Sequence, residues 1–219
     1  MDADSGEVLI PVAGAGLPAD LTLPDEPAGV VLFAHGSGSS RRSPRNVAVA
    51  RVLNRVALAT VLVDLLTPEE DAVDARTAEL RFDIGMLADR LAAIVDWMGA
   101  ESSLSPLPVG LFGASTGAAA ALVAAAARPD RVRAVVSRGG RPDLAGAALS
   151  GVRAPTLLLV GGLDEEVITL NERAMDALPD GVAELRVIPG ATHLFEEPGT
   201  LEQVAREAAD WFATRLRPV

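Results

Sequence analysis

The chain has no cysteine and no lysine among its 219 residues, and only two histidines, His35 and His193. Without cysteine there is no disulfide, no thiolate metal ligand and no cysteine nucleophile. Two histidines are too few for a histidine-rich metal site. We therefore expect chemistry that needs neither a metal nor another cofactor.

Long apolar stretches and an excess of positive charge are also missing. No apolar run approaches the roughly 20 residues that span a bilayer. The first residues, Met-Asp-Ala-Asp, have neither the basic nor the apolar region of a secretory signal, so we expect a cytoplasmic protein. The formal net charge of -11 repels nucleic acid and anionic membrane surfaces. Neither is expected as a partner, and the oligomeric state stays open.

Apolar residues make up 49% of the chain but aromatic residues only 3%, so the core must consist mainly of alanine, valine and leucine. A chain of this length fits one domain over residues 1–219. Short β-branched runs alternate with longer segments rich in alanine, leucine and arginine. This alternation predicts the α/β class, with a mostly parallel sheet of about eight strands flanked by helices.

The individual elements follow from these runs. The predicted strands cover residues 8–12, 17–23, 30–34, 60–65, 109–112, 132–136, 156–160 and 184–187. The predicted helices cover about residues 44–57, 82–98, the segment after Ser115, about 167–178 and about 201–216. Gly14 and Gly16 separate the first two strands, which indicates an antiparallel hairpin at one edge of the sheet.

Two connections decide how open a site above the sheet would be. The segment between the strands 132–136 and 156–160 is too short for a large inserted lid. The loop 66–80 is the other place where a partial cover could form.

The pentapeptide Gly113-Ala-Ser115-Thr-Gly117 lies between a predicted strand and a predicted helix. This context is that of a nucleophile elbow, in which a serine sits on a sharp, strained turn. The glycines are needed because the residues around the serine pass one another closely. The alternative is a tight strand–helix turn without chemistry. The context favours Ser115 as a nucleophile.

A serine nucleophile needs a base and an acid that orients it. After an elbow of this kind the acid and then the histidine follow along the chain, each on a loop after a strand. His193 is the only histidine downstream of Ser115, although it could also be a surface loop residue. Asp164 follows the strand 156–160 and is the predicted acid. Glu165 and Glu166 are rivals that could instead be helix-start charges.

The oxyanion of an acyl-transfer reaction needs two backbone donors. The amide of Thr116, directly after the nucleophile, is one candidate. The other should come from the glycine-rich loop after the third strand, where Ser37 is the predicted donor. His35 in the same loop is expected to brace it rather than to act as a second base.

The same loop continues into Arg41, Arg42 and Arg45, which could bind a substrate carboxylate through forked hydrogen bonds. The alternative is that they pair with surface acids, and this alternative is slightly favoured. The loop lacks the Lys-Ser/Thr of a P-loop and the spacing of a dinucleotide fold, so a nucleotide site is disfavoured. Gly36, Arg41 and Arg45 are the candidate substrate-binding residues.

These motifs together resemble the α/β-hydrolase superfamily over almost the whole chain. They are His35-Gly-Ser-Gly, the elbow at Ser115, Gly-Gly-Leu-Asp164 and Gly-Ala-Thr-His193. The compact size and the absence of a large lid resemble the dienelactone-hydrolase-like group. Residues 33–46 and 64–70 resemble the hydrolase domain that is sometimes joined to a phosphoribosyltransferase.

One departure from this group limits the substrate. Dienelactone hydrolases proper use a cysteine nucleophile, whereas this chain has Ser115. The resemblance therefore implies hydrolysis of a small-molecule ester, lactone or thioester, but it does not carry the lactone substrate across. Two alternatives stay open: a catalytically inactive binding or regulatory protein on the same fold, and an acyltransferase or peptidase with the same triad.

Overall fold

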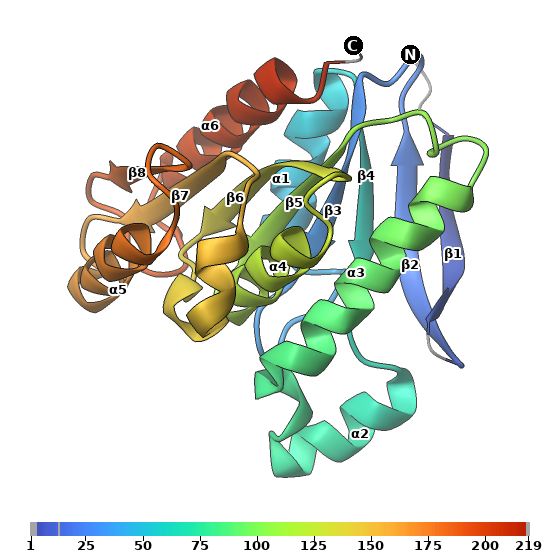
Figure 1. Cartoon of the computed structure of the whole chain (residues 1–219), viewed down its shortest axis with the longest axis horizontal. Helices are drawn as coiled ribbons and strands as arrows, with labels where there is room; N and C mark the ends of the chain where they lie inside the picture. The colour runs from blue at the N-terminus through green and yellow to red at the C-terminus, as the bar shows by residue number, and fades with distance from the viewer. Residues whose placement is uncertain (1–3, 13, 218–219) are drawn as a thin grey trace.

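The computed structural model describes residues 4–12 and 14–217 and contains an eight-stranded sheet in the order β1-β2-β4-β3-β5-β6-β7-β8 (Figure 1). The strands are Asp4–Val12, Ala15–Leu23, Gly29–Ala34, Leu58–Val63, Val109–Ala114, Val132–Arg138, Thr156–Gly161 and Ala183–Ile188. β1, β2 and β4 pair antiparallel, and all other neighbours are parallel. The predicted mostly parallel sheet and the edge hairpin are confirmed.

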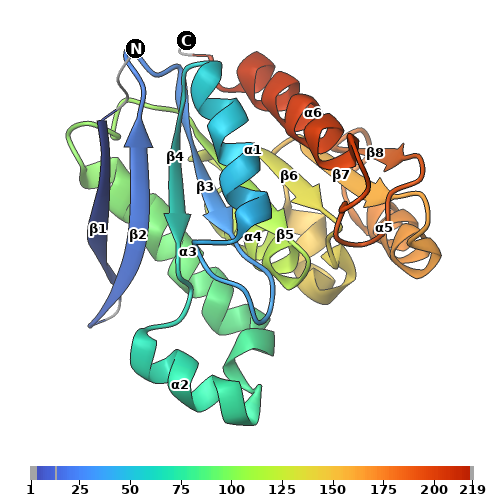
Figure 2. The ribbon, with the colours of Figure 1, turned by 180° about the vertical axis from the view of Figure 1, so that it is seen from behind.

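Helices cover both faces of this sheet. They are α1 (Pro44–Arg55), α2 (Pro68–Thr77), α3 (Ile84–Ala100), α4 (Thr116–Ala127), α5 (Glu165–Ala177) and α6 (Thr200–Arg215), with 3-10 segments η1 (Leu80–Phe82) and η2 (Pro142–Gly151). α3, α4 and α5 cover one face (Figure 1), and α1 and α6 cover the other (Figure 2). No helix among the described residues is long and apolar enough to cross a membrane.

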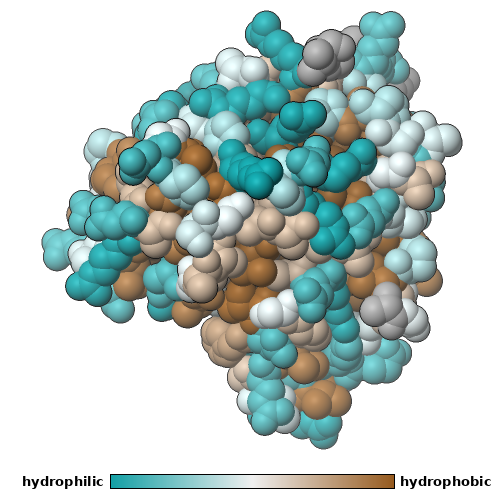
Figure 3. Space-filling view, viewed as in Figure 1, coloured by the Kyte–Doolittle hydropathy of each residue, from teal (hydrophilic) through white to brown (hydrophobic). Residues whose placement is uncertain are grey.

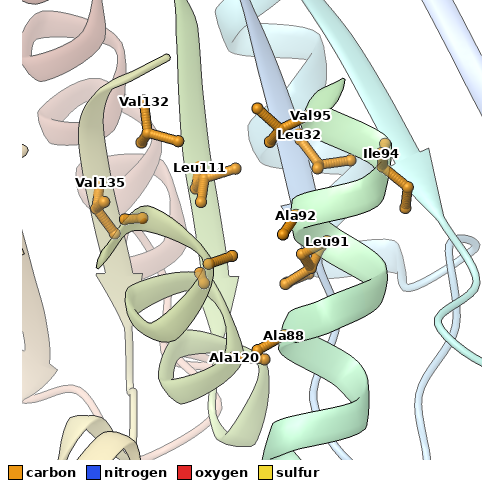
Figure 4. Packing of buried hydrophobic residues seen from close by; sticks show 14 of the residues in the cluster. Leu32, Ala88, Leu91, Ala92, Ile94, Val95, Leu111, Ala120, Val132 and Val135 are labelled. Carbon is orange, nitrogen blue, oxygen red and sulfur yellow. The ribbon is translucent and has the colours of Figure 1, made fainter. Parts of the chain in front are cut away.

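The central strands are buried on both faces, which explains their almost continuous apolar sequences. On one face, Leu91 of α3 and Ala120 of α4 pack above Leu32 and Leu111 of the sheet (Figure 4). The alanine-rich sequence of α4 allows this helix to lie close to the sheet. A second apolar cluster on the opposite face holds α1 and α6 against the same strands.

The segment 66–80, predicted as a loop, contains the helix α2. Thr67 caps it: its hydroxyl accepts from Glu70 N at 3.3 Å, and the Glu70 carboxylate accepts from Thr67 N at 2.8 Å. Pro68 follows at the first helical position, where its missing N–H costs nothing. Glu70 also accepts from Arg90 of α3 at 2.5 Å. α2 lies beyond the carboxyl ends of the parallel strands and forms the partial cover expected there (Figures 1 and 2).

Smaller differences occur at two other connections. α3 begins at Ile84 instead of Phe82, because the Asp83 carboxylate accepts from Met86 N at 2.9 Å and caps the helix there. The β6–β7 connection, predicted only as a short segment, contains η2. No large lid is inserted at this connection, all of whose residues are described, as the sequence predicted.

Candidate active site

Ser115 occupies the turn between β5 and α4 with φ 50° and ψ -122°, a backbone conformation that non-glycine residues rarely adopt. Neighbouring glycines make the turn sterically feasible. A Cβ at position 113 would lie 2.4 Å from Ala118 Cα, and one at position 117 would lie 2.4 Å from the Ala34 oxygen. The turn therefore has the strained geometry of a nucleophile elbow.

Asp164 and His193 lie on neighbouring loops, after β7 and after β8. His193 Nδ1 is 2.6 Å from Asp164 Oδ2. An ionised carboxylate only accepts, so Nδ1 carries the hydrogen, and a neutral imidazole in this tautomer has its lone pair on Nε2. Of the three candidate acids, Asp164 is the one that contacts His193, whereas Glu165 and Glu166 form the first turn of α5.

The segment after β6 connects the elbow with the loop that follows β8 and carries His193, here called the histidine loop. Ser115 N donates to Arg138 O at 3.2 Å, and Arg141 N donates to Ser115 O at 3.1 Å. Between them, a Cβ on Gly139 would lie 3.0 Å from His193 O and 3.7 Å from His193 Cε1. This segment thus contacts both Ser115 and His193. Within the described part of the chain, the Ser115 hydroxyl has no hydrogen-bond partner.

The sequence pattern does not single out this segment as part of the site. Its signal is the glycine pair Gly139-Gly140 directly after a buried strand, since paired glycines at a strand end mark a turn or a close approach. Gly139 has φ +51°, where a side chain would be strained.

His35 braces the loop after β3 through both ring nitrogens. Leu65 N donates to His35 Nε2 at 3.1 Å, so Nδ1 carries the hydrogen and donates to Gly36 O at 2.9 Å. Burial lowers the pKa of His35, which favours this neutral form. His35 therefore has the bracing contacts expected from the sequence, and neither ring nitrogen is free to act as a base.

The two predicted oxyanion donors lie side by side. Ser37 N donates to Thr116 Oγ1 at 2.9 Å. Thr116 is the first residue of α4, and the N–H groups of a first helical turn have no acceptor within the helix. Gly36 is adjacent, because a Cβ there would lie 3.0 Å from Ser115 Cβ. The structure thus brings Gly36, Ser37 and Thr116 next to Ser115.

A cavity of about 240 Å³ opens beside these residues. Gly36, Ser37 and Thr116 form one wall. Other lining residues come from the segment after β4, from α2, from η1 and from α3, including Leu65, Leu66, Asp71, Arg81 and Leu87. The cavity therefore combines apolar side chains with a few polar groups, as small-molecule sites commonly do.

The predicted substrate-binding arginines have carboxylate partners. Arg41 lines the cavity, and its guanidinium group contacts the carboxylates of Glu7, Asp20 and Asp64. Arg45 NH1 lies 3.4 Å from Glu196 Oε1. Both contacts match the alternative in which these arginines pair with acids of the protein. Their binding of substrate stays a prediction.

Apolar side chains are exposed next to the acid and the base. Leu163 directly precedes Asp164 and is 64% exposed, and Leu194 directly follows His193 and is 39% exposed.

On the face that carries α3, α4 and α5, hydrophobic residues interrupt the hydrophilic surface (Figure 3). Among the described residues, no group of three or more histidine, aspartate or glutamate side chains is placed to hold a metal ion.

A mostly parallel sheet in this strand order, with a serine on the β5–α4 elbow, defines an α/β-hydrolase fold. The chain belongs to the dienelactone hydrolase family, whose family model matches residues 22–216.

Two solved structures are similar to this chain. The crystal structure of a dienelactone hydrolase from Anabaena variabilis is 55% identical, covers 98% of this chain and 99% of its own, and has a TM-score of 0.96. A serine hydrolase without a lid from Xanthomonas campestris is 20% identical over 99% of this chain and 97% of its own, with a TM-score of 0.77, which shows the fold alone.

A curated protein of Mycobacterium tuberculosis strain H37Rv, provisionally named a phosphoribosyl transferase, is 58% identical over 207 residues. The match covers 94% of this chain but only 44% of the relative. The chain therefore spans less than half the length of that protein, and the name describes the longer protein.

Proposed function

We propose that this chain is a serine hydrolase that cleaves a carboxylic ester, lactone or thioester of a small molecule. Ser115 is the nucleophile, His193 the general base and Asp164 the residue that orients the imidazole. The observation that carries the proposal is the 2.6 Å contact between His193 and Asp164. The segment after β6 separates this pair from the strained elbow at Ser115.

The reaction follows from these positions. Ser115 Oγ attacks the substrate carbonyl while His193 Nε2 takes its proton, and Asp164 stabilises the imidazolium that forms. The imidazolium then protonates the leaving alkoxide or thiolate, which leaves an acyl group on Ser115. Water attacks this acyl-enzyme with His193 again as the base, and the carboxylic acid is released.

The negative charge that develops on the carbonyl oxygen is stabilised by the amides of Thr116 and Ser37. Ser37 N donates to the Thr116 hydroxyl in this structure. The Ser37 amide would have to exchange this contact for one to the oxyanion when substrate binds. The contact keeps the Ser37 amide directed at the elbow before substrate binds.

The surroundings favour a small substrate with an apolar part. The cavity of about 240 Å³ beside Gly36 and Thr116 is below the range of drug-sized sites, and it suits a short acyl or alcohol group. Leu163 and Leu194, the chain neighbours of the proposed acid and base, offer further exposed apolar surface. Larger apolar groups of the substrate would contact these two leucines.

Other functions receive less support. Phosphoribosyl transfer belongs to the name of relatives more than twice as long as the matched segment, and no feature of the Ser115 site favours it. An inactive binding protein has no need of a His193–Asp164 pair beside a strained serine. An acyltransferase or peptidase would use the same residues, and it differs in the acceptor or in the bond attacked.

Hydrolysis of p-nitrophenyl acetate by the wild type and by Ser115→Ala tests the proposal. We expect the variant to lose at least about 10³-fold in kcat/KM, because the members of a triad act as a unit. The exposed Ser150→Ala is the matched control and should retain the wild-type rate. Equal rates for Ser115→Ala and the wild type would overturn the proposal.

A further inference from the structure

A cluster of polar side chains lies next to the histidine loop. It centres on Arg138, the last residue of β6. Its side chain is only 6% exposed. Arg138 NH2 donates to Asn46 Oδ1 at 3.3 Å, whereas Nε is buried without a hydrogen-bond partner among the described residues. Within the same part of the chain no carboxylate forms an ion pair with Arg138. A buried guanidinium group that has no carboxylate partner and keeps one N–H unpaired is energetically costly.

Arg45 adds a second positive charge to this cluster. Its Nε is also buried and unpartnered within the described residues. Among the described residues its one carboxylate contact is to Glu196, which is 64% exposed and 3.4 Å away. Burial and the charge of Arg45 lower the pKa of Arg138 to about 10, so the Arg138 guanidinium group stays charged at neutral pH.

The amino end of α1 is a third source of positive potential. Arg45 and Asn46 lie in the first turn of this 12-residue helix, which has no acidic residue there. Helix amino ends carry a partial positive charge that stabilises anions and repels cations. Two arginines and a helix amino end therefore lie together where the described part of the chain supplies one exposed carboxylate.

We propose that this cluster, formed by Arg138, Arg45 and the start of α1, is a binding site for a small monovalent anion. The two unpartnered Nε–H groups donate to the anion, which neutralises the repulsion between the guanidinium groups. Chloride is the simplest occupant. Burial of Arg138 disfavours larger or doubly charged ions, whose desolvation costs more.

The site is separate from the cavity beside Thr116, because neither Arg138 nor Arg45 lines that cavity. It contacts the histidine loop instead. The guanidinium carbon of Arg138 lies 6.0 Å from the centre of the Phe195 ring, and Phe195 follows His193 by two residues. A bound anion would thus hold α1, β6 and the histidine loop together.

Line broadening of ³⁵Cl⁻ in NMR spectra of the whole protein tests the site without measuring activity. We expect the wild type to show a saturable excess linewidth. Arg138→Gln should abolish this component and Arg45→Gln should weaken it. Arg206→Gln, at an exposed position on α6, is the matched control and should retain it. Identical saturable broadening in the wild type, Arg138→Gln and Arg45→Gln would overturn the proposal.

Wild-type crystals soaked in sodium bromide give a test that needs no variant. We expect an anomalous peak within hydrogen-bonding distance of both Nε atoms, and no peak there would contradict the site. Acetate added to the NMR titration identifies the source of the anion. Displacement of chloride by acetate would show that the site accepts carboxylates, including one on a substrate, whereas persistence of the chloride signal would restrict it to halides.

Discussion

His193 Nδ1 lies 2.6 Å from Asp164 Oδ2, and this contact joins the loops that follow β7 and β8. The two strands are parallel neighbours in the sheet, so their carboxyl ends bring the two loops to the same edge. The contact fixes the tautomer of His193 and leaves Nε2 free to accept a proton. Of the three adjacent acids, Asp164 is the one that contacts His193.

Asp164→Asn should lower the kcat of ester hydrolysis by about 10⁴-fold, because an amide at this position favours the wrong histidine tautomer. Glu165→Gln and Glu166→Gln serve as controls, since neither side chain contacts His193, and both should retain most of the activity. Steady-state kinetics on all three variants provide the measurement. A larger loss in either control than in Asp164→Asn would assign the acid differently.

The buried His35 predicts a pH dependence of stability. Its folded-state pKa is lowered by burial, so below about pH 6.5 the unfolded chain binds a proton that the folded chain resists. The stabilisation contributed by neutral His35 is therefore complete above this pH and declines as the pH falls below it.

Urea unfolding of the wild type and of His35→Gln between pH 5 and pH 8 isolates this contribution. The glutamine does not titrate, so the destabilisation caused by the substitution should be largest at pH 8 and smaller at pH 5. A difference between the two proteins that is constant over this range, or that grows on acidification, would refute the linkage.

Gly117→Ala should lower the free energy of unfolding by at least about 2 kcal/mol. The added methyl group would lie 2.4 Å from the Ala34 oxygen and 2.5 Å from the His35 oxygen, and neither backbone group can move easily. Gly85→Ala is the matched control, since its Cβ would make only ordinary contact at 3.5 Å and alanine favours a helix. Chemical denaturation of both variants would show whether the crowding at the elbow is real.

Thr67→Ala should cost about 1 kcal/mol in unfolding free energy, because it removes the hydroxyl that caps α2. Thr67→Ser retains the hydroxyl and should cost much less. The two values come from parallel urea titrations. If serine and alanine destabilised the protein equally, the cap would not account for the stability of α2.

The alternation of short β-branched runs with longer helical segments was sufficient to predict the sheet. β3, β5 and β7 are short apolar runs buried on both faces. Ser115, Asp164 and His193 were each predicted on a loop after a strand, and parallel strands bring such loops to one edge of the sheet. The capping box formed by Thr67 and Glu70 was recognised only in the structure. α2 was predicted as a loop, because its single buried residue, Asp74, leaves no apolar stripe to mark a helix.

Contacts that depend on tertiary structure could not be predicted in the same way. Arg138 and Asn46 are 92 residues apart, and no local pattern indicates that their side chains meet. The three acids around Arg41 come from different parts of the chain, so the sequence left ion pairing and substrate binding as alternatives. Burial and pairing of single charged residues require the packed structure.

Labelling with a fluorophosphonate tests the central claim most directly, because the probe reacts with an activated serine whatever the natural substrate is. Intact-mass analysis should show one adduct on the wild type, and peptide mapping should place it on Ser115. Ser115→Ala should remain unmodified under the same conditions. No adduct on the wild type, or equal labelling of Ser115→Ala, would contradict the assignment of Ser115 as the nucleophile of a serine hydrolase.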